Sequence, residues 1–169
     1  MKHVSIALLC VAAALCIMRA DPSIQDTIRI QKTQAPILAS AVSNADKIEL
    51  ISLDPVFHRG SQDEPGIKRL DRWKIIGQVT IDDKDEIRHM ASALQRAIER
   101  SNGDSALCFD PRHAIRFRSG SREIVVIACF KCQFAEIRGF ENLQSATIAH
   151  EFEKEWDQIF KKHGFPKAP

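Results

Sequence analysis

The chain has 169 residues, a formal net charge of +2 at pH 7 and an apolar content of 44%. This length predicts a single domain that is large enough to bury a core of its own. A charge so close to neutral excludes a general electrostatic attraction to nucleic acid or to anionic membranes.

Residues 1–20 predict a secretory signal peptide. Lys2 precedes an apolar run over residues 4–18, and a run of about 15 residues is short for a transmembrane helix. We expect cleavage near Ala20, although an uncleaved membrane anchor or a lipid-modified leader is an alternative. Cleavage would remove two basic residues and no acidic one. The sequence therefore predicts an exported protein, periplasmic or secreted, that binds no nucleic acid and keeps no stable membrane span.

The segment that follows the leader, residues 21–46, is polar with scattered apolar residues and is interrupted by Pro36. We expect a tether here, with at most a short helix around residues 37–42. The single folded domain is then expected to span residues 47–165.

Two strands are predicted at the start of this domain. Residues 47–53 alternate between polar and apolar types, and Asp54-Pro55 ends the alternation. Residues 58–66, which begin with His58, combine two glycines and a proline with charged residues and predict a solvated loop. Residues 73–81 predict the second strand, with Gly77 as a candidate β-bulge.

A helix is predicted from about Lys84 to Ser101, with Asp82 or Asp83 as its N-cap and Gly103 just past its end. Apolar residues recur at steps of three and four along it, as on the buried face of a helix. These residues are Ile87, Met90, Leu94, Ala97 and Ile98.

A β-hairpin is predicted next, because residues 115–118 alternate, residues 122–128 are almost continuously apolar, and Gly120 lies between them. With Gly120 as the midpoint, Cys108 falls opposite Cys132. Pairing is expected to fray before it reaches Cys108, since a proline at position 111 cannot donate to the ladder. We still expect Cys108 to lie close to the second arm's cysteines.

The C-terminal part predicts one more strand and one more helix. Residues 134–138 form the strand, which either continues the second hairpin arm or turns beside it. The last helix is expected to start at Ser145 or Thr147 and to end at Gly164 and Pro166. Its apolar side carries Ile148, Phe152, Trp156, Ile159 and Phe160. The order β-β-α-β-β-β-α predicts an α+β fold, a mainly antiparallel sheet with two helices on one face.

The cysteines outside the leader are Cys108, Cys129 and Cys132. If the strand runs straight through Cys129 and Cys132, their α-carbons are about 10 Å apart, too far for a bond between them. The favoured interpretation is then a structural disulfide from Cys108 to one of the two.

Two other chemistries stay open for the same residues. If residues 130–131 turn, then Cys108, His113, Cys129 and Cys132 could form a three-thiolate, one-imidazole zinc site. A redox-active or nucleophilic thiol is the third possibility. His113 has a plain structural interpretation as well, as a sheet residue that follows a bend at Pro111.

The pattern Cys-Phe-x-Pro-Arg-His at residues 108–113, followed by Cys-Phe-x-Cys at residues 129–132, resembles a group of small exported bacterial proteins of unassigned function. The similarity covers roughly residues 47–140. It implies export and a shared cysteine-centred site, and it names no activity.

The sequence thus leaves two functions to test. The first is a non-enzymatic domain, stapled by its cysteines, that binds another protein as an inhibitor or immunity factor does; it needs no catalytic residue and no cofactor. The alternative is a zinc- or thiol-dependent protein whose site is Cys108, His113, Cys129 and Cys132.

Overall fold

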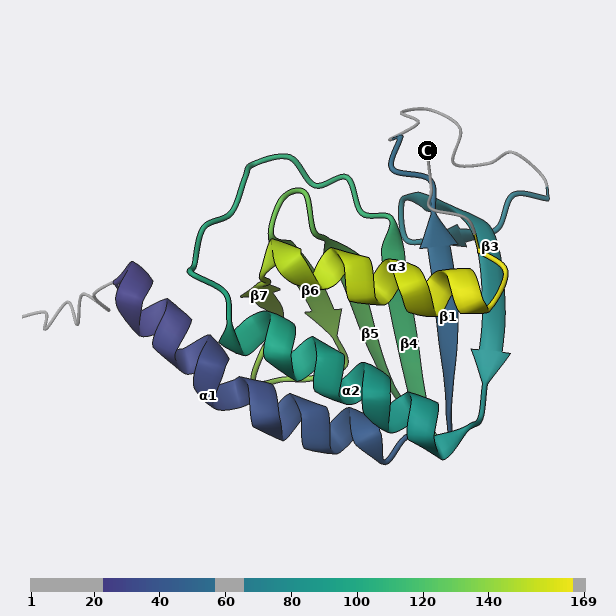
Figure 1. Cartoon of the computed structure of the whole chain (residues 1–169), viewed down its shortest axis with the longest axis horizontal. Coiled ribbons are helices and arrows are strands. Elements are labelled where there is room, and N and C mark those ends of the chain that lie inside the picture. The colour runs from purple at the N-terminus through teal and green to yellow at the C-terminus, as the bar shows by residue number, and fades with distance from the viewer. Residues whose placement is uncertain (1–22, 57–65, 166–169) are drawn as a thin grey trace, which may run out of the picture.

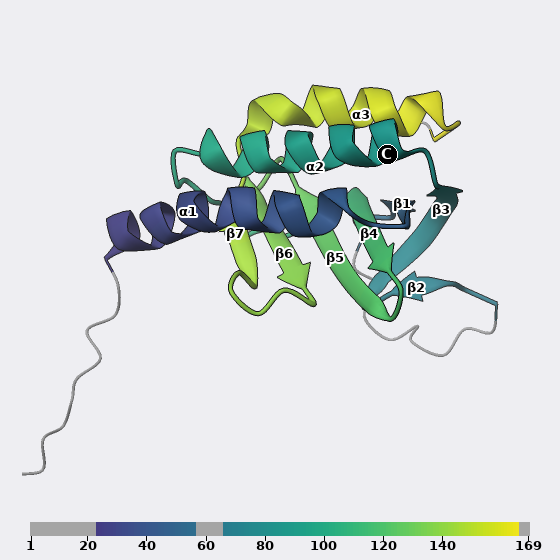
Figure 2. The ribbon, with the colours of Figure 1, turned by 90° about the horizontal axis from the view of Figure 1, so that it is seen from below.

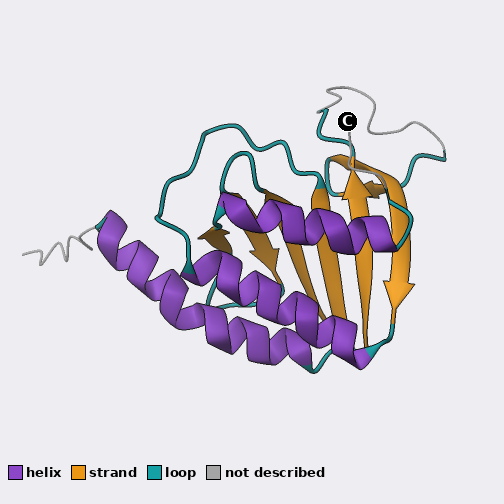
Figure 3. Cartoon of the chain, viewed as in Figure 1, coloured by secondary structure: helices purple, strands orange, loops and turns teal. Residues whose placement is uncertain are grey.

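The computed structural model describes residues 23–56 and 66–165, so the predicted leader, most of the loop that includes His58, and Pro166 lie outside the described residues. Within them, three α-helices accompany one antiparallel sheet, whose strands lie side by side in the order β2-β3-β1-β4-β5-β6-β7 (Figures 1 and 3). The predicted α+β class and mainly antiparallel sheet are confirmed. The helices are α1 (Ile24–Ser43), α2 (Lys84–Glu99) and α3 (Glu153–Lys162), and the strands are β1 (Lys47–Leu53), β2 (Arg69–Leu70), β3 (Trp73–Ile81), β4 (His113–Ser119), β5 (Arg122–Cys129), β6 (Phe134–Arg138) and β7 (Ser145–Thr147).

The sheet separates a large apolar cluster from a small one. Figure 2 shows the three helices on one side of the sheet, and the large cluster combines buried residues of these helices with strand residues such as Ile48 and Leu50. The small cluster joins Ile51 and Trp73 to Phe109, which belongs to the segment between α2 and β4. Of the helices described, none is long and apolar enough to cross a membrane.

Helix α1 replaces the predicted tether, so that prediction is wrong. The buried positions of α1 recur at helical spacing, but most are small or polar residues with a weak apolar signal: Gln31, Ala35, Leu38, Ala39 and Val42. Pro36 lies on the exposed side of the helix, as does Lys32, four residues earlier. The carbonyl that loses its helical bond to Pro36 can therefore be hydrated. At the start of the helix, Ser23 Oγ accepts a hydrogen bond of 3.2 Å from the Asp26 amide.

The predictions for β1, β3 and α2 are confirmed in position. Ser52 pairs with Gly77 and the next residue pairs with Ile75, so Ile76 is the extra residue of a bulge beside Gly77. Asp83 caps α2, because its Oδ1 accepts a 2.8 Å hydrogen bond from the Glu86 amide. The predicted apolar stripe of α2 is fully buried.

The predicted hairpin forms, but its register differs by one residue. Ser119 pairs with Arg122, so the turn consists of Gly120 and Ser121, and Gly120 has φ +56°. A two-residue turn of this kind matches the twist of the two strands better than a turn centred on Gly120. Pairing with β5 ends at His113, which lies opposite Ala128.

The segment predicted to begin the last helix is a strand, so this prediction is wrong at its N-terminal end. Thr147 pairs with Phe134 as part of β7, and a 3₁₀ turn over His150–Phe152 precedes α3. The strand forms here because its backbone completes the sheet beside β6. The predicted apolar side of the last helix is nevertheless buried.

Candidate functional site

The Cys129-x-x-Cys132 motif lies at a sharp turn between β5 and β6. Strand β5 ends at Cys129, which pairs with Phe134, and the four residues between them form the turn. Gln133 adopts φ +53° and its amide donates a 3.1 Å hydrogen bond to the carbonyl of Phe130. Because the chain reverses here, the α-carbons of Cys129 and Cys132 are 5.3 Å apart and the two residues form a disulfide.

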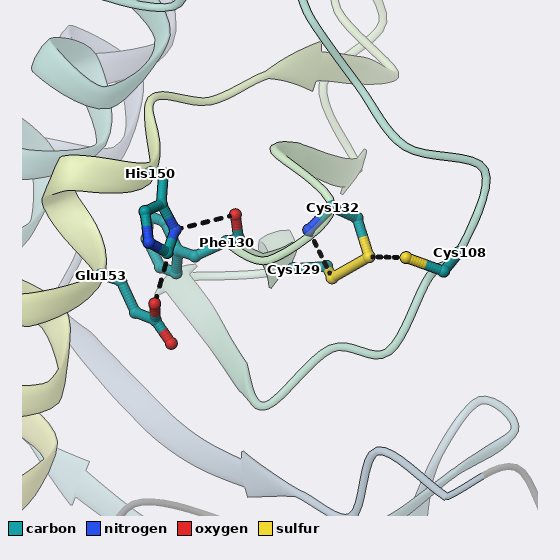
Figure 4. The surroundings of a disulfide bond; sticks show 6 residues. All are labelled: Cys108, Cys129, Phe130, Cys132, His150 and Glu153. Atoms are coloured by element: carbon teal, nitrogen blue, oxygen red, sulfur yellow. Dashed lines mark hydrogen bonds and ion pairs between the residues drawn. A yellow bond between two sulfur atoms is a disulfide. The ribbon is translucent and has the colours of Figure 1, made fainter.

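Cys108 lies beside this disulfide but is not bonded to it. Its Sγ is 3.1 Å from Cys132 Sγ (Figure 4). The prediction that Cys108 approaches the second arm is confirmed, whereas the favoured bond from Cys108 to Cys129 or Cys132 is absent from the described structure. The straight-strand geometry behind that expectation is replaced by the turn, which lets Cys129 and Cys132 bond to each other.

Two hydrogen bonds and the packing of one aromatic ring hold the segment that carries Cys108. The Ala106 amide donates a 3.0 Å hydrogen bond to the carbonyl of Cys132. The carbonyl of Arg112 accepts a 3.0 Å hydrogen bond from the amide of Leu53, the last residue of β1. Between these two bonds, the ring of Phe109 packs edge-on against Trp73 and Phe134, at centroid distances of 6.1 and 5.7 Å. Contacts on both sides of Cys108 therefore fix its position over the turn.

The turn itself is anchored on the opposite side, toward the helices. The ring of Phe130 is 5.2 Å from the ring of Trp156 and 5.9 Å from that of His113. The carbonyl of Phe130 is 3.2 Å from His150 Nδ1 (Figure 4). Each half of the sequence motif thus places a phenylalanine next to a cysteine as an anchor, Phe109 on one side and Phe130 on the other. The sequence reasoning gave neither residue this role, although both stand in the motif.

The three cysteines of this group differ sharply in solvent exposure. Cys129 and Cys132 are 1% and 0% exposed, whereas Cys108 is exposed. An external reagent therefore meets Cys108 before it meets either half of the disulfide.

His113 is held away from the cysteines by its own partner. Its Nε2 is 2.9 Å from Asp157 Oδ1 of α3, and its ring is 4.7 Å from that of Phe160. His113 is 4% exposed, so this pair joins β4 to α3 inside the protein. The zinc set predicted from the sequence is not assembled, and no group of three or more potential metal-ligating side chains occurs among residues 23–56 and 66–165.

Helix α3 is also held to α2 by glutamates. Glu86 lies 2.6 Å from His163 Nε2 and 3.2 Å from Lys162 Nζ. Burial alone raises the pKa of Glu86, but the hydrogen bonds and positive charges of these two partners outweigh it. The pKa of Glu86 is therefore below its usual value of 4.5.

Glu155 forms a second link of this kind in the opposite direction, from α3 to α2. Its Oε1 is 2.9 Å from His89 Nε2 and 2.6 Å from Arg96 Nη2. Burial raises the pKa of Glu155, and the hydrogen bonds from these two partners lower it by more, so the pKa is below 4.5.

A third ionic cluster lies on the sheet, where Glu49 is almost fully buried. Its carboxylate is 2.6 Å from Arg116 Nη1 and 2.8 Å from Arg118 Nη1, and it accepts a 3.0 Å hydrogen bond from Gln78. These partners come from the two strands that flank β1. We interpret the cluster as structural, because every one of its members has a charged or polar partner within the sheet.

Of these clusters, only the cysteine group combines an exposed free cysteine with a buried disulfide. A free cysteine whose Sγ is 3.1 Å from a disulfide sulfur has its thiol next to the bond that thiol–disulfide exchange breaks. Comparisons with protein-family models, curated proteins and solved structures found no match to this chain.

Proposed function

We propose that the protein works by thiol–disulfide exchange, with Cys108, Cys132 and Cys129 as its reactive group. The distance of 3.1 Å between Cys108 Sγ and Cys132 Sγ carries this proposal. It develops the thiol-dependent alternative of the sequence analysis. Binding of another protein without chemistry stays a prediction, and so does export, which would place the disulfide in an oxidising compartment.

The exchange begins at the exposed thiol. After Cys108 loses its proton to solvent, the thiolate attacks Cys132 Sγ and a Cys108–Cys132 bond forms. The Cys129–Cys132 bond breaks, and its electron pair goes to Cys129, which leaves as a thiolate and takes up a proton. One disulfide replaces another, so the step needs no external oxidant or reductant.

The backbone favours Cys129 as the leaving group. The Cys132 amide donates a 3.2 Å hydrogen bond to Cys129 Sγ (Figure 4). A hydrogen bond to the charged form of an acid stabilises that form, so this amide would stabilise the thiolate that develops on Cys129. The arrangement gives each sulfur a different role: Cys108 attacks, Cys132 is exchanged and Cys129 leaves.

Differential alkylation followed by peptide mapping tests the proposal. The full chain, with Cys10 and Cys16 replaced by serine, would be held at about pH 8, where a large share of thiols ionises, then quenched in acid and mapped. We expect the free thiol to be divided between Cys108 and Cys129. Cys108→Ser should show only the Cys129–Cys132 disulfide.

Cys129→Ser supplies the matched control. Mild oxidation of this variant should join Cys108 to Cys132, because the two sulfurs are already close. A free thiol found only at Cys108 in the parent, together with no Cys108–Cys132 bond in Cys129→Ser, would refute the exchange.

A further inference from the structure

Cys108 and its surroundings indicate what the exchange acts on. Resting on the proposed exchange, we infer that the substrate is a pair of thiols in another polypeptide, and that Cys108 passes the buried disulfide to it. We base this on the exposure of the three cysteines, on the solvent-exposed residues around Cys108, and on a reaction that balances between the two proteins.

The buried position of the disulfide makes Cys108 its point of contact with the outside. Cys132 is 0% and Cys129 is 1% exposed, so a thiolate on a bulky molecule cannot approach either sulfur in line. After the internal exchange, the new disulfide joins Cys132 to Cys108, and one of its two sulfurs belongs to an exposed residue. Exchange therefore moves the disulfide from a shielded place to an accessible one.

The surface around Cys108 is open to solvent and carries an apolar side chain. Residues 104–108 are all exposed, and the side chain of Leu107, next to the thiol, is fully in solvent. Four surface cavities are lined by residues of α1, α2, α3, the β4–β5 turn and the segments around β6, and Cys108 lines none of these four. Those four cavities offer a small thiol no pocket beside Cys108, whereas a polypeptide can place an apolar side chain against the exposed Leu107.

The reaction then balances within the two proteins. A substrate thiolate attacks Cys108 Sγ, the Cys108–Cys132 bond breaks, and Cys132 takes the electron pair and a proton. The second substrate thiolate attacks the substrate sulfur of this mixed disulfide, which releases Cys108 as a thiolate. The substrate loses two electrons and two protons and gains a disulfide. Cys129 and Cys132 take up these electrons and protons and end as two thiols, while Cys108 is again a free thiol.

A short unstructured peptide with two cysteines, incubated with the oxidised full chain that lacks Cys10 and Cys16, tests this. Peptide oxidation would be followed by mass spectrometry. We expect one disulfide per protein, formed at least about 100-fold faster than with Cys108→Ser, because a thiol held beside the disulfide acts at a high effective concentration.

A second probe identifies the sulfur that meets the substrate. A peptide with one cysteine cannot complete the reaction, so it should remain attached to Cys108. Leu107→Ser should slow the peptide reaction about fivefold, through loss of one apolar contact, and leave the rate with dithiothreitol unchanged. Leu107 is fully exposed, so this variant keeps the fold.

The outcomes separate this inference from the exchange on which it rests. Attachment to Cys132 or Cys129, an undiminished rate in Cys108→Ser, or no reaction with either peptide would overturn the inference. If internal exchange is still found by mapping, the proposed function survives that result. Equal loss of both rates in Leu107→Ser would show that the leucine does not recognise a polypeptide.

Discussion

Replacement of Trp156 by alanine should destabilise the protein strongly, because this side chain joins α3 to the sheet. Trp156 is 1% exposed, and its ring lies 5.2 Å from Phe130 and 6.3 Å from His113. Among the described residues its Nε1 has no hydrogen-bond partner, so the loss is one of packing alone. Truncation of a buried tryptophan costs about 3–5 kcal/mol of unfolding free energy.

This loss can be measured as a change in melting temperature. For a domain of this size, each kcal/mol shifts Tm by about 2–4 °C, so Trp156→Ala should melt about 6–20 °C below the parent. Far-UV circular dichroism is the suitable readout, since it does not depend on tryptophan emission. Urea unfolding at constant temperature would give the free energy independently.

Two further variants make this test specific. Trp156→Phe should cost less than the alanine variant, since it keeps a ring and removes an N–H group that has no partner in the described structure. Ile37→Ala, at a half-exposed position of α1, should change stability by less than about 0.5 kcal/mol. A Tm shift below about 2 °C for Trp156→Ala would mean that α3 does not dock through this face.

Three other perturbations follow from the described contacts. Acidification should weaken the fold, because the folded-state pKa values of Glu86 and Glu155 lie below the usual 4.5. The stability that these two carboxylates contribute is complete above pH 4.5 and is lost as the pH falls through their folded-state pKa values. Urea midpoints measured downward from about pH 6 should show this fall, and a double glutamine variant should show a shallower one. Gly139→Ala should lower the free energy of unfolding by at least about 1–3 kcal/mol, because φ is +77° and a Cβ would collide with a backbone carbonyl of β5. Gly66→Ala is the control: its φ is +89° but the space around it is open, so it should lose only the free energy of the backbone strain. Glu49→Ala should cost about 2–4 kcal/mol in urea unfolding, because two arginines lose a buried partner, and a cost near zero would show that solvent screens the cluster.

The strands and helix that the sequence predicts correctly are those in which large apolar residues repeat with a clear period. Helix α2 combines such a stripe with a side-chain cap at Asp83. Helix α1 has the same spacing of buried positions, but alanines and Gln31 fill several of them. Its Pro36 is tolerated because it faces solvent, and the direction in which a proline faces depends on tertiary packing.

At the cysteine site, the sequence predicted which residues meet but not which of them bond. The hairpin pattern was enough to bring Cys108 near Cys132. The bond between Cys129 and Cys132 depends on a turn that requires positive φ at Gln133, and glutamine does not signal such a conformation as glycine does. The partner of His113 was also hidden from sequence, because Asp157 lies on a helix 44 positions further along the chain.

The hydrogen bonds from Thr147 to Gln31 have a consequence for how this protein avoids association with itself. Strand β7 ends the sheet, and an edge strand offers free backbone groups to which a strand of another molecule can add. Here the amide of Thr147 donates to Gln31 Oε1 at 3.1 Å, and its hydroxyl donates to the same oxygen at 3.0 Å. A side chain of α1 thus occupies the place that an incoming strand's carbonyl would take. Helix α1 therefore packs in the core and, through Gln31, also blocks part of the β7 edge to pairing with another strand.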